Sequence, residues 1–414
     1  MTFENLANIA LVTPGTSPKG DLINTKGIGL PFFQGSKEFK ELYPVAERHT
    51  EFAVKVAKIG DVLISVRAPV GEVNIAREDC SIGRGVMSVR ANKKSEQMFL
   101  FYFLKNLQGK WDLLGSTGSV FENLSTTALN NVEIPIGLER EVIGDVLFNL
   151  DSKIAANNAL SKTLEEIAQT IFKSWFIDFD PVKAKMAGEK PAGMDAAIAA
   201  LFANSMEESE LGLIPKGWEI LQSTDLFNVL SGGTPKTSNE AYWNGDIPWF
   251  SVVDAPDSGG CFFIKTTKTI TIEGLDNSAA KLVRPGVTVI SARGTVGKTA
   301  IVAIPSTFNQ SCYGIEGKYG DFFTYLLLRN QIARLQNISH GGMFDTITRD
   351  TFSAIKVAKP QSEIMKNFES LVSPIFLEIR SLQFQSDNLA SIRDSLLPRL
   401  ISGELQIPEE MLAS

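Results

Sequence analysis

The sequence predicts an α+β fold in which two similar strand-rich α/β domains are separated by two long helices. The stretch Gly60–Gly71 recurs as Gly286–Gly297 without a gap, at a constant offset of 226 residues. A helical apolar pattern follows each copy at an offset of 225 residues, and short β-rich runs fill most of both copies. Two copies of one globular unit imply a molecule with two similar binding faces.

Residues 1–138 are expected to form the first domain, in which strands dominate. Its β-rich runs are separated by Gly, Pro and Asn, and they are Phe52–Val56, Asp61–Val66, Glu72–Ala76 and Gly85–Val89. One helix should interrupt the strands, because four apolar residues recur at helical spacing: Phe99, Tyr102, Phe103 and Leu107.

Residues 139–180 are expected to form one long helix, about 55–60 Å in length at about 1.5 Å per residue. Apolar or small residues follow one another in alternating steps of four and three, which is the pattern of a heptad seam. Its polar members, Asn157 and Ser161, either set the register against a partner helix or are tolerated in a loose seam. The full seam is Ile143, Leu147, Leu150, Ile154, Asn157, Ser161, Leu164, Ala168, Ile171 and Trp175.

Residues 181–215 are expected to be a linker that joins the two halves. The Ala-rich piece Met194–Ala203 predicts one short helix, and an acidic run, Glu207–Glu210, follows it. Residues 216–360 then repeat the layout of the first domain. Their matching helix is predicted from Phe322, Tyr325, Leu326 and Leu328.

Residues 361–414 are expected to form the second long helix, ending at about Ile401, and a tail. Pro374 either kinks this helix or marks a fresh first turn. Because the two seams match and an internal repeat tends towards a pseudo-twofold axis, the two helices should pair as an antiparallel coiled coil. The second seam is Ile375, Ile379, Leu382, Ser386, Leu389, Arg393, Leu396 and Leu400.

The composition favours a soluble globular chain, with 44% hydrophobic and 21% charged residues. No apolar run approaches the roughly 18 residues that a membrane span needs, and no secretory signal is apparent at the N-terminus. The three cysteines show neither metal spacing nor a disulfide framework, which suits a reducing cytoplasm. We therefore expect a cytoplasmic protein without a membrane partner.

The net charge of −7 is distributed unevenly. Residues 1–136 carry +1 and residues 216–360 carry +2, whereas the helices, the linker and the tail carry the remaining −10. A polyanion responds to the local face rather than to the total charge. The balance therefore neither excludes nor indicates a nucleic-acid partner.

Motifs of known catalytic sites are incomplete in this chain. Ala292–Thr299 approximates a phosphate-binding loop, but it lacks the first Gly, and Ala300–Ile304 reads as a strand where a helix should follow. Glu316-Gly-Lys318 looks locally like part of a nuclease site, yet its repeat equivalent has no carboxylate. Only two histidines occur, His49 and His340. We therefore expect no catalytic residue and no metal site.

Several segments resemble the specificity subunits of type I restriction-modification systems. Leu164–Pro181 looks like the central conserved helix of that family, and Ile392–Glu404 resembles its distal conserved helix. The repeated Gly-x-x-x-Ile-Ser-x-Arg-x-x-x-Gly and the openings Thr13–Pro18 and Ser231–Pro235 resemble the family's target-recognition domains. The resemblance covers nearly the whole chain.

This resemblance implies a DNA-binding subunit without catalysis of its own. Each target-recognition domain would read one half of a bipartite, asymmetric site in double-stranded DNA. The helices would set the spacing and dock two methyltransferase (modification) subunits, which restriction subunits would join. S-adenosylmethionine, ATP and Mg would be bound by those partners, and this chain would bind no cofactor.

Base reading and phosphate anchoring need polar and cationic side chains on a rigid scaffold. For each candidate, the alternative interpretation is a solvated surface charge or a turn residue. The candidates in the first domain are Lys19, Lys26, Gln34, Arg67, Arg84, Ser116, Thr117 and Ser119. Those in the second domain are Lys236, Ser251, Arg293, Lys298, Gln310, Ser339 and His340, the last two in the predicted loop Ile338–Gly342.

The aromatic residues at the end of the first long helix have two interpretations. Trp175, Phe176 and Phe179 either pack as core against the partner helix or dock a methyltransferase subunit. Two alternatives to the overall function also stay open. One is a scaffold that binds protein or glycan, and the other is a fused nuclease or methylase with a divergent site.

Overall fold

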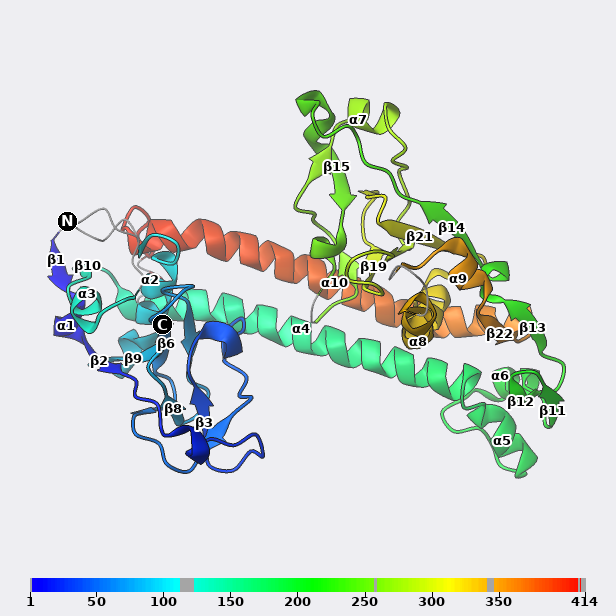
Figure 1. The fold of residues 1–414 in the computed structure, drawn as a ribbon, viewed down its shortest axis with the longest axis horizontal. Coiled ribbons are helices and arrows are strands. Elements are labelled where there is room, and N and C mark those ends of the chain that lie inside the picture. Colours follow the sequence, from blue (N-terminus) through cyan, green and yellow to red (C-terminus); the bar gives the residue numbers. More distant parts are fainter. Residues whose placement is uncertain (1, 112–122, 257–258, 341–345, 409, 411–414) are drawn as a thin grey trace. The chain divides into compact units, whose positions relative to one another are not determined.

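The computed structural model describes residues 2–111, 123–256, 259–340, 346–408 and 410, with only the backbone described at residues 334 and 337–340. The chain divides into two compact units (Figure 1). Unit 1 consists of Met1–Ile154 and Asp387–Ser414, and unit 2 of Ala155–Ser386. Two long helices, α4 (Arg140–Phe176) and α10 (Ser362–Ile401), each contribute to both units.

Unit 1 contains two four-stranded sheets and one two-stranded sheet. The first sheet has the order β2-β9-β6-β7, with β2 Ala10–Pro14, β9 Val86–Ala91, β6 Val62–Ser65 and β7 Val73–Ile75. The second has the order β4-β3-β8-β5, with β4 His49–Thr50, β3 Leu30–Phe33, β8 Cys80–Ile82 and β5 Val56–Ala57. The third pairs β1 with β10, Phe3–Asn5 with Glu133–Pro135. The short helices are α1 (Leu6–Ile9), α2 (Gln97–Asn106) and α3 (Thr126–Asn130).

Unit 2 repeats this arrangement, with five strands instead of four in its main sheet and three instead of four in its second sheet. Its main sheet has the order β14-β21-β18-β19-β16, formed by Phe227–Ser231, Cys312–Gly317, Thr288–Ser291, Thr299–Val302 and Phe262–Phe263. Its second sheet has the order β17-β15-β20, formed by Thr269–Ile270, Trp243–Phe250 and Thr307–Phe308. The pair β13–β22, Glu219–Gln222 with Lys356–Lys359, corresponds to β1–β10. The helices are α7 (Ile272–Asp276), α8 (Asp321–His340) and α9 (Arg349–Ser353).

The strand registers of the two units agree residue by residue. Val62 faces Ile75 and Val89 in unit 1, and Thr288 faces Ile301 and Ile315 in unit 2, each at the offset of 226. All four residues of β6 and of β18 are buried, as expected for a strand covered on both faces. The repeat seen in the sequence is therefore a structural repeat.

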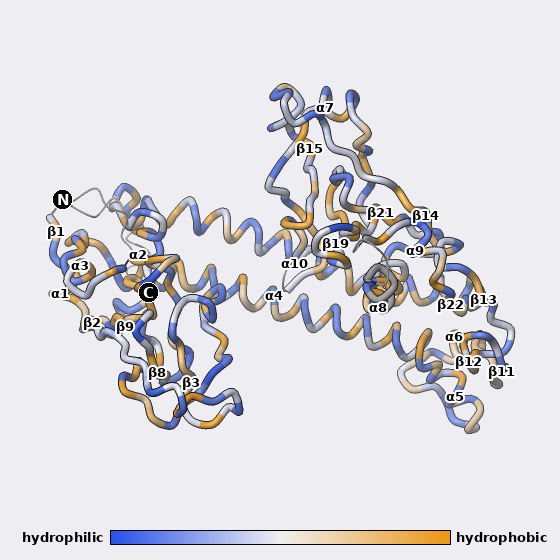
Figure 2. Tube along the Cα trace, viewed as in Figure 1, coloured by the Kyte–Doolittle hydropathy of each residue, from blue (hydrophilic) through white to orange (hydrophobic). Residues whose placement is uncertain are grey.

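The predicted helices lie where their apolar spacing placed them. Phe99, Tyr102 and Phe103 of α2 are buried in unit 1, and Tyr325, Leu326 and Leu328 of α8 are buried in unit 2. Apolar and polar residues alternate along α4 and α10 (Figure 2), and no member of either predicted seam is fully exposed. Within unit 2, Asn157 contacts Gln385 and Phe172 contacts Phe368, so the two helices run antiparallel there. The pseudo-twofold axis stays a prediction.

The polar seam residues behave differently from one another. The Asn157 side-chain amide donates to Gln385 Oε1 at 2.7 Å, so this residue can set the register of the pair. Ser161 is 1% exposed, and among the described residues its hydroxyl has no hydrogen-bond partner. The buried hydroxyl of Ser386 likewise has no partner among the described residues. Ser161 therefore fits the interpretation of a small residue tolerated in the seam.

Several predicted elements were wrong in detail. Phe52–Val56 is not a strand; Phe52 and Val54 are 58% and 55% exposed, and pairing begins only at Val56, opposite Ser81. A strand there would have had no face to bury. The helix α10 continues through Pro374, without a fresh start. Residues 338–340 belong to α8 rather than to a loop, and residues 341–342 lie outside the described part.

The segment 181–215 contains more structure than one short helix. The predicted helix is present as α6 (Ala196–Leu201). A further helix, α5 (Asp180–Met186), starts with Pro181 in its first turn after the left-handed residue Phe179, a combination that ends α4 and begins a new helix. The strands β11 (Met206–Ser209) and β12 (Gly212–Pro215) form a hairpin. Sequence reasoning missed α5 and this hairpin because both depend on single turn residues.

Candidate nucleic-acid interface

The repeated glycine–serine–arginine motif forms the same loop in both units. In unit 1, Ser65 N donates to the Glu72 carbonyl at 2.8 Å, Gly71 N to the Ser65 carbonyl at 3.0 Å and Glu72 N to Ser65 Oγ at 2.9 Å. In unit 2 the equivalent bonds of Ser291, Gly297 and Lys298 measure 2.9, 3.0 and 2.9 Å. Both closing glycines have positive φ, which favours glycine. The serine and the glycines of the motif thus have a folding role.

The side chain of the motif's arginine makes no such contact in the described part of the chain. Arg67 and Arg293 are exposed, and within the described residues neither side chain has a hydrogen-bond or ion-pair partner. Only their backbones are engaged, in isolated β-bridges to Asn123 and Thr346. A guanidinium held on a rigid loop but left unpaired is suited to an external anion or base edge.

Four loops meet beside this arginine through backbone hydrogen bonds. In unit 1, Val66 N donates to the Gly85 carbonyl at 2.9 Å, Gly83 N to the Phe33 carbonyl at 2.8 Å and Thr16 N to the Ile82 carbonyl at 2.9 Å. These bonds join four segments, 15–19, 33–35, 66–67 and 83–85. Gln34, Arg67 and Arg84 each lie within one residue of such a bond, so the fold brings their backbones together.

Unit 2 repeats the same bonds at the same offsets. Ala292 N donates to the Ser311 carbonyl at 2.8 Å, and Asn309 N donates to the Phe250 carbonyl at 2.9 Å. Gly233 N donates to the Phe308 carbonyl at 3.0 Å. The segments 232–236, 250–251, 292–293 and 309–311 therefore meet as their counterparts do. We call each set of four loops a loop cluster.

One glycine in each unit explains why the opening segment can approach so closely. A Cβ atom on Gly15 would lie 2.2 Å from the Gly83 carbonyl oxygen, and one on Gly232 would lie 2.1 Å from that of Asn309. These distances are far below van der Waals contact with rigid backbone. Each opening therefore needs glycine at this position to join its loop cluster.

The other predicted residues of the loop clusters differ in their surroundings. Gln34 is exposed, and its side-chain oxygen accepts from Arg48 at 3.0 Å. Ser251 is half-buried, and its hydroxyl donates to Asp254 at 2.9 Å. Lys19, Arg84 and Lys236 are exposed. In the described part of the chain their side chains have no hydrogen-bond or ion-pair partner.

Sequence reasoning missed one pair of residues in the clusters, Ser17 and Thr234. Ser17 Oγ accepts from Arg84 N at 3.2 Å, and the Thr234 hydroxyl donates to the side-chain oxygen of Gln310. Both hydroxyls thus contact the same position of the repeat. The signal was present, since the two openings align at an offset of 217 residues. The sequence does not show, however, that the openings lie beside Arg84 and Gln310 in the fold.

The remaining candidates lie elsewhere or are not described. Lys26 is exposed on the loop after Asn24, whose side-chain oxygen accepts from its backbone N–H at 3.0 Å. Lys298 follows Gly297 and is half-buried. Ser116, Thr117 and Ser119 lie outside the described residues, and the side chains of Ser339 and His340 are likewise not described.

The aromatic residues predicted for docking lie in the core of unit 2. Trp175 and Phe176 are 6% and 7% exposed and pack on Phe368 with ring centroids 5.5 and 4.9 Å away. Phe179 packs on Trp218 at 5.4 Å. Their burial favours the core interpretation over a docking surface, because a buried ring offers little area to a partner.

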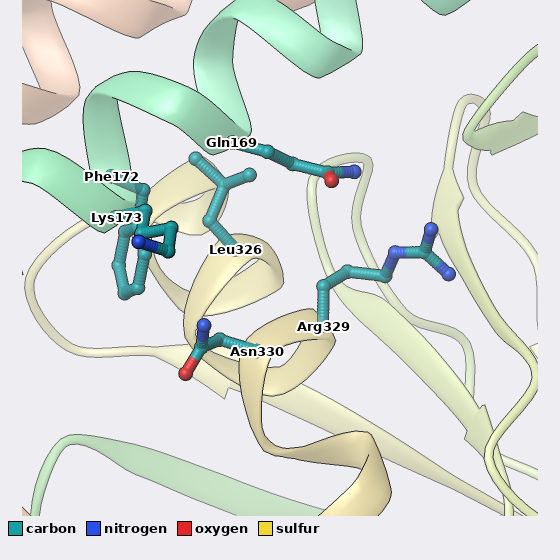
Figure 3. A pocket seen from close by; sticks show the side chains of 6 residues that line it. All are labelled: Gln169, Phe172, Lys173, Leu326, Arg329 and Asn330. Carbon is teal, nitrogen blue, oxygen red and sulfur yellow. The ribbon is translucent and has the colours of Figure 1, made fainter. Parts of the chain in front are cut away.

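A cavity of about 290 Å³ lies beside this core, between α4 and α8 (Figure 3). Gln169, Phe172 and Lys173 line it from α4, and Leu326, Arg329 and Asn330 line it from α8. Its cations already have partners, since Lys173 pairs with Asp178, and Arg329 lies 3.7 Å from Glu165. The cavity therefore does not have the character of a site for an anion.

The residues that looked like parts of a catalytic site have structural contacts. Glu316 accepts from Arg284 at 3.2 Å, and Lys318 Nζ donates to the Asp225 carbonyl at 3.1 Å. The segment after the phosphate-loop lookalike is strand β19, as predicted. Among the described residues, no group of three His, Cys, Asp or Glu side chains is arranged to hold a metal ion. None of the described helices is long and apolar enough to span a membrane.

Known proteins match both the sequence and the fold. A family model described as the type I restriction modification DNA specificity domain matches residues 5–166 and 215–380. The HindI specificity subunit of Haemophilus influenzae is 30% identical over 329 residues, covering 69% of this chain and 70% of that protein. The MjaIX specificity subunit of Methanocaldococcus jannaschii is 27% identical over 424 residues, covering 98% and 94%.

A solved structure supports the fold independently. The crystal structure of a type I restriction-modification S subunit from M. genitalium superposes with a TM-score of 0.59 at 16% identity, covering 96% of this chain and 95% of that chain. The family model matches well over half of the chain, once in each half. The chain therefore belongs to the family of type I restriction-modification specificity subunits, as its repeated motif and its two helix segments predicted.

Proposed function

We propose that each unit of this chain reads one half of a bipartite, asymmetric target in double-stranded DNA. The observation that supports this most strongly is the pair of loop clusters, built by the same hydrogen bonds and each carrying an exposed arginine whose side chain has no partner among the described residues. Side chains on a rigid scaffold of loops are a common means of base reading. The clusters carry Gln34 and Arg84 in unit 1 but Ser251 and Gln310 in unit 2, so the two half-sites should differ.

We propose further that the chain supplies recognition and no catalysis. Methylation and cleavage would belong to two methyltransferase subunits and to restriction subunits, which would bind S-adenosylmethionine, ATP and Mg. The incomplete catalytic motifs of this chain, and the structural contacts of Glu316 and Lys318, support this division. DNA binding would be strongly salt-dependent, since phosphate contacts release counterions.

The long helices would set the unspecific gap between the half-sites and carry the methyltransferase subunits. At about 1.5 Å per residue, the 37 residues of α4 and the 40 of α10 correspond to helices about 55 and 60 Å long. Recognition elements that read adjacent turns of B-DNA are about 34–36 Å apart. Helices of this length are therefore long enough to separate two half-sites by at least one turn.

The test is to co-express the chain with the modification subunits of its own system and to map methylated bases across a genome. We expect one asymmetric sequence of two short specific parts separated by bases of any identity. Duplexes with either half-site scrambled should bind more weakly, and affinity should fall with salt. A palindromic or contiguous methylated site would contradict bipartite reading. Catalysis by the purified chain alone, given DNA and cofactors, would contradict the division of labour.

A further inference from the structure

The two loop clusters share two cationic positions and differ at two others. Lys19 corresponds to Lys236, and Arg67 corresponds to Arg293. The backbone of the lysine is held alike in both units, since its carbonyl accepts the N–H three residues later, at 3.0 Å from Leu22 and 3.1 Å from Asn239. Lys19 and Lys236 thus carry the same charge and accept the same backbone hydrogen bond.

The other two positions carry different chemistry on the same scaffold. Arg84 in unit 1 corresponds to Gln310 in unit 2, and Gln34 corresponds to Ser251. Each position is held by a neighbour. Ser17 contacts the backbone of Arg84, and Thr234 the side chain of Gln310. The other two positions have unrelated neighbours, since Arg48 contacts Gln34 and Asp254 contacts Ser251. The scaffold therefore presents residue types that vary, and of their supports only the hydroxyl of Ser17 and Thr234 occupies the same position in both units.

We propose that the shared cations bind backbone phosphates and that the differing positions, Gln34 and Arg84 in unit 1 and Ser251 and Gln310 in unit 2, read bases. Contacts to phosphate are the same for every sequence, whereas base edges differ. A chain that reads two different half-sites with one scaffold must therefore change its base-reading positions and can keep its phosphate-binding ones. This inference rests on the proposed function.

The side-chain chemistry of the differing positions fits base edges. The Arg84 guanidinium, which has no partner among the described residues, matches the O6 and N7 acceptors of guanine. The amides of Gln34 and Gln310 match adenine, and the Ser251 hydroxyl is less selective. Thr234 and Arg48 act as positioning residues that hold these amides before DNA arrives. Unit 1 should accordingly discriminate strongly at a guanine.

The test uses the complex of the chain with its modification subunits, after its target has been mapped. Fluorescence anisotropy would measure affinity for four duplexes: the target, each half-site scrambled separately, and both scrambled. Exchange variants give one unit the residues of the other: Gln34→Ser with Arg84→Gln, or Ser251→Gln with Gln310→Arg. We expect the first exchange to lower affinity about ten-fold or more for duplexes that retain half-site 1, with little change when half-site 1 is scrambled. The second exchange should act on half-site 2 alone.

Variants at the shared positions should weaken binding without any preference for one half-site. Arg67→Ala and Arg293→Ala should weaken binding to all four duplexes by a similar factor, leave the methylated sequence unchanged and lower the salt slope by about one each. Lys94→Ala, which removes an exposed cation away from the clusters, should change neither quantity. Circular dichroism melting confirms that each variant is folded.

The inference is overturned if an exchange weakens binding to all four duplexes equally, or if Arg67→Ala changes the methylated sequence. Unchanged affinity in both arginine variants would also overturn it. Failure of the proposed function itself is a separate result, because the wild-type complex would then show no preference for the mapped duplex over the scrambled ones before any variant is made.

Discussion

The two units attach their strand-rich parts to the long helices through the same tyrosine but through different chemistry. Tyr102 of α2 corresponds to Tyr325 of α8, and both hydroxyls donate to a carboxylate on α4, Asp151 or Glu165, at 2.7 Å. The two carboxylates are not equivalent positions of the repeat, and around Tyr102 unit 1 places a buried ion pair. Unit 2 places aromatic and small apolar residues at the equivalent positions.

In unit 1 the junction is charged. Asp151, whose side chain is 4% exposed, accepts from Arg393 and Tyr102 and lies 3.6 Å from Lys105 Nζ. Burial, reinforced by the Asp151 carboxylate, raises the pKa of Tyr102, and burial lowers the pKa of Lys105. A buried pair of this kind contributes little net stability, but removing one partner is costly.

In unit 2 the same positions are apolar. At the helix offset of 225, Asp151 corresponds to Phe376 and Arg393 to Ala168, and both unit 2 residues are fully buried. Phe376 stacks on Phe322 with ring centroids 4.5 Å apart and meets Tyr325 edge-on at 5.7 Å. The comparison teaches that one fold accommodates either an ion pair or apolar packing at these two positions, although in unit 2 Glu165 still lies nearby, 3.7 Å from Arg329.

The largest effect is expected from breaking the apolar junction. Phe376→Ala should lower the free energy of unfolding by about 4 kcal/mol, because it removes a fully buried ring and leaves a cavity. Denaturant unfolding measures the loss, and hydrogen exchange should localise it to unit 2. Leu377→Ala, at the next residue and 54% exposed, is the matched control and should stay within about 0.5 kcal/mol.

Breaking the charged junction should cost somewhat less. Asp151→Ala should lower the free energy of unfolding by about 3 kcal/mol, since Lys105 would lose its buried counter-charge and Arg393 would keep only the exposed Asp394. Denaturant unfolding with hydrogen exchange of unit 1 is the measurement. Asp145→Ala removes an exposed carboxylate from the same helix and should have almost no effect. Equal losses in the two variants would contradict a specific role for Asp151.

Converting one junction into the other sharpens the comparison. The triple variant Asp151→Phe, Arg393→Ala and Lys105→Leu gives unit 1 the residue types of Phe376, Ala168 and Leu328. We expect it to recover more than half of the loss caused by Asp151→Ala, because a complete apolar set replaces an incomplete charged one. A triple variant less stable than the single variant would show that the two junctions are not interchangeable.

The N-terminal part of the long helix in each junction, α4 in unit 1 and α10 in unit 2, offers a second contrast. Glu369 accepts from the N–H groups of Phe322 and Phe323 at 3.1 and 2.8 Å, whereas its counterpart in unit 1 is Gly144. A Cβ on Gly144 would lie 2.5 Å from Phe99 N. Gly144→Ala should therefore destabilise unit 1 by about 2 kcal/mol through overpacking. Thermal unfolding measures this loss, and Ala156→Gly, at an exposed α4 position, controls for helix propensity alone.

The smallest effect concerns pH. Burial raises the pKa of Glu369, although the N–H groups of Phe323 and Phe322 partly offset this. In the window between the ordinary and the raised pKa, the folded state binds more protons than the unfolded state, so this group's contribution to stability rises as pH falls. Glu369→Gln should remove that contribution to the pH profile measured by denaturant unfolding. An identical slope in variant and wild type would contradict it.

Family membership and the repeat were readable from local patterns. The motif around Arg67 and Arg293, the seam from Ile143 to Trp175 and the helix of Phe99 and Tyr102 are all periodicities of a few residues. They were confirmed because periodicity depends on which face is buried. Phe52–Val56 was wrong because β propensity alone does not supply a partner strand.

The candidate site was only partly predictable. Arg67 and Arg293 were named from the repeat, but Ser17 and Thr234 were missed, and Ser251 proved to be engaged with Asp254. Equivalent positions are visible in a sequence, whereas the hydrogen bonds that engage or release a side chain are not. The aromatic residues Trp175 and Phe176 illustrate the same limit, because spacing alone does not distinguish a core ring from an exposed one.

The sequence by itself determined that this protein has two equivalent units, where their main helices run and which polar residues recur. Such features follow from short-range spacing and from comparison of one half with the other. Only the tertiary structure decided which loops meet, because that depends on hydrogen bonds between residues up to 75 positions apart, such as Gly233 with Phe308. It also decided that Asp151 and Arg393 form a pair where unit 2 has Phe376 and Ala168, since burial and pairing arise only when distant segments pack.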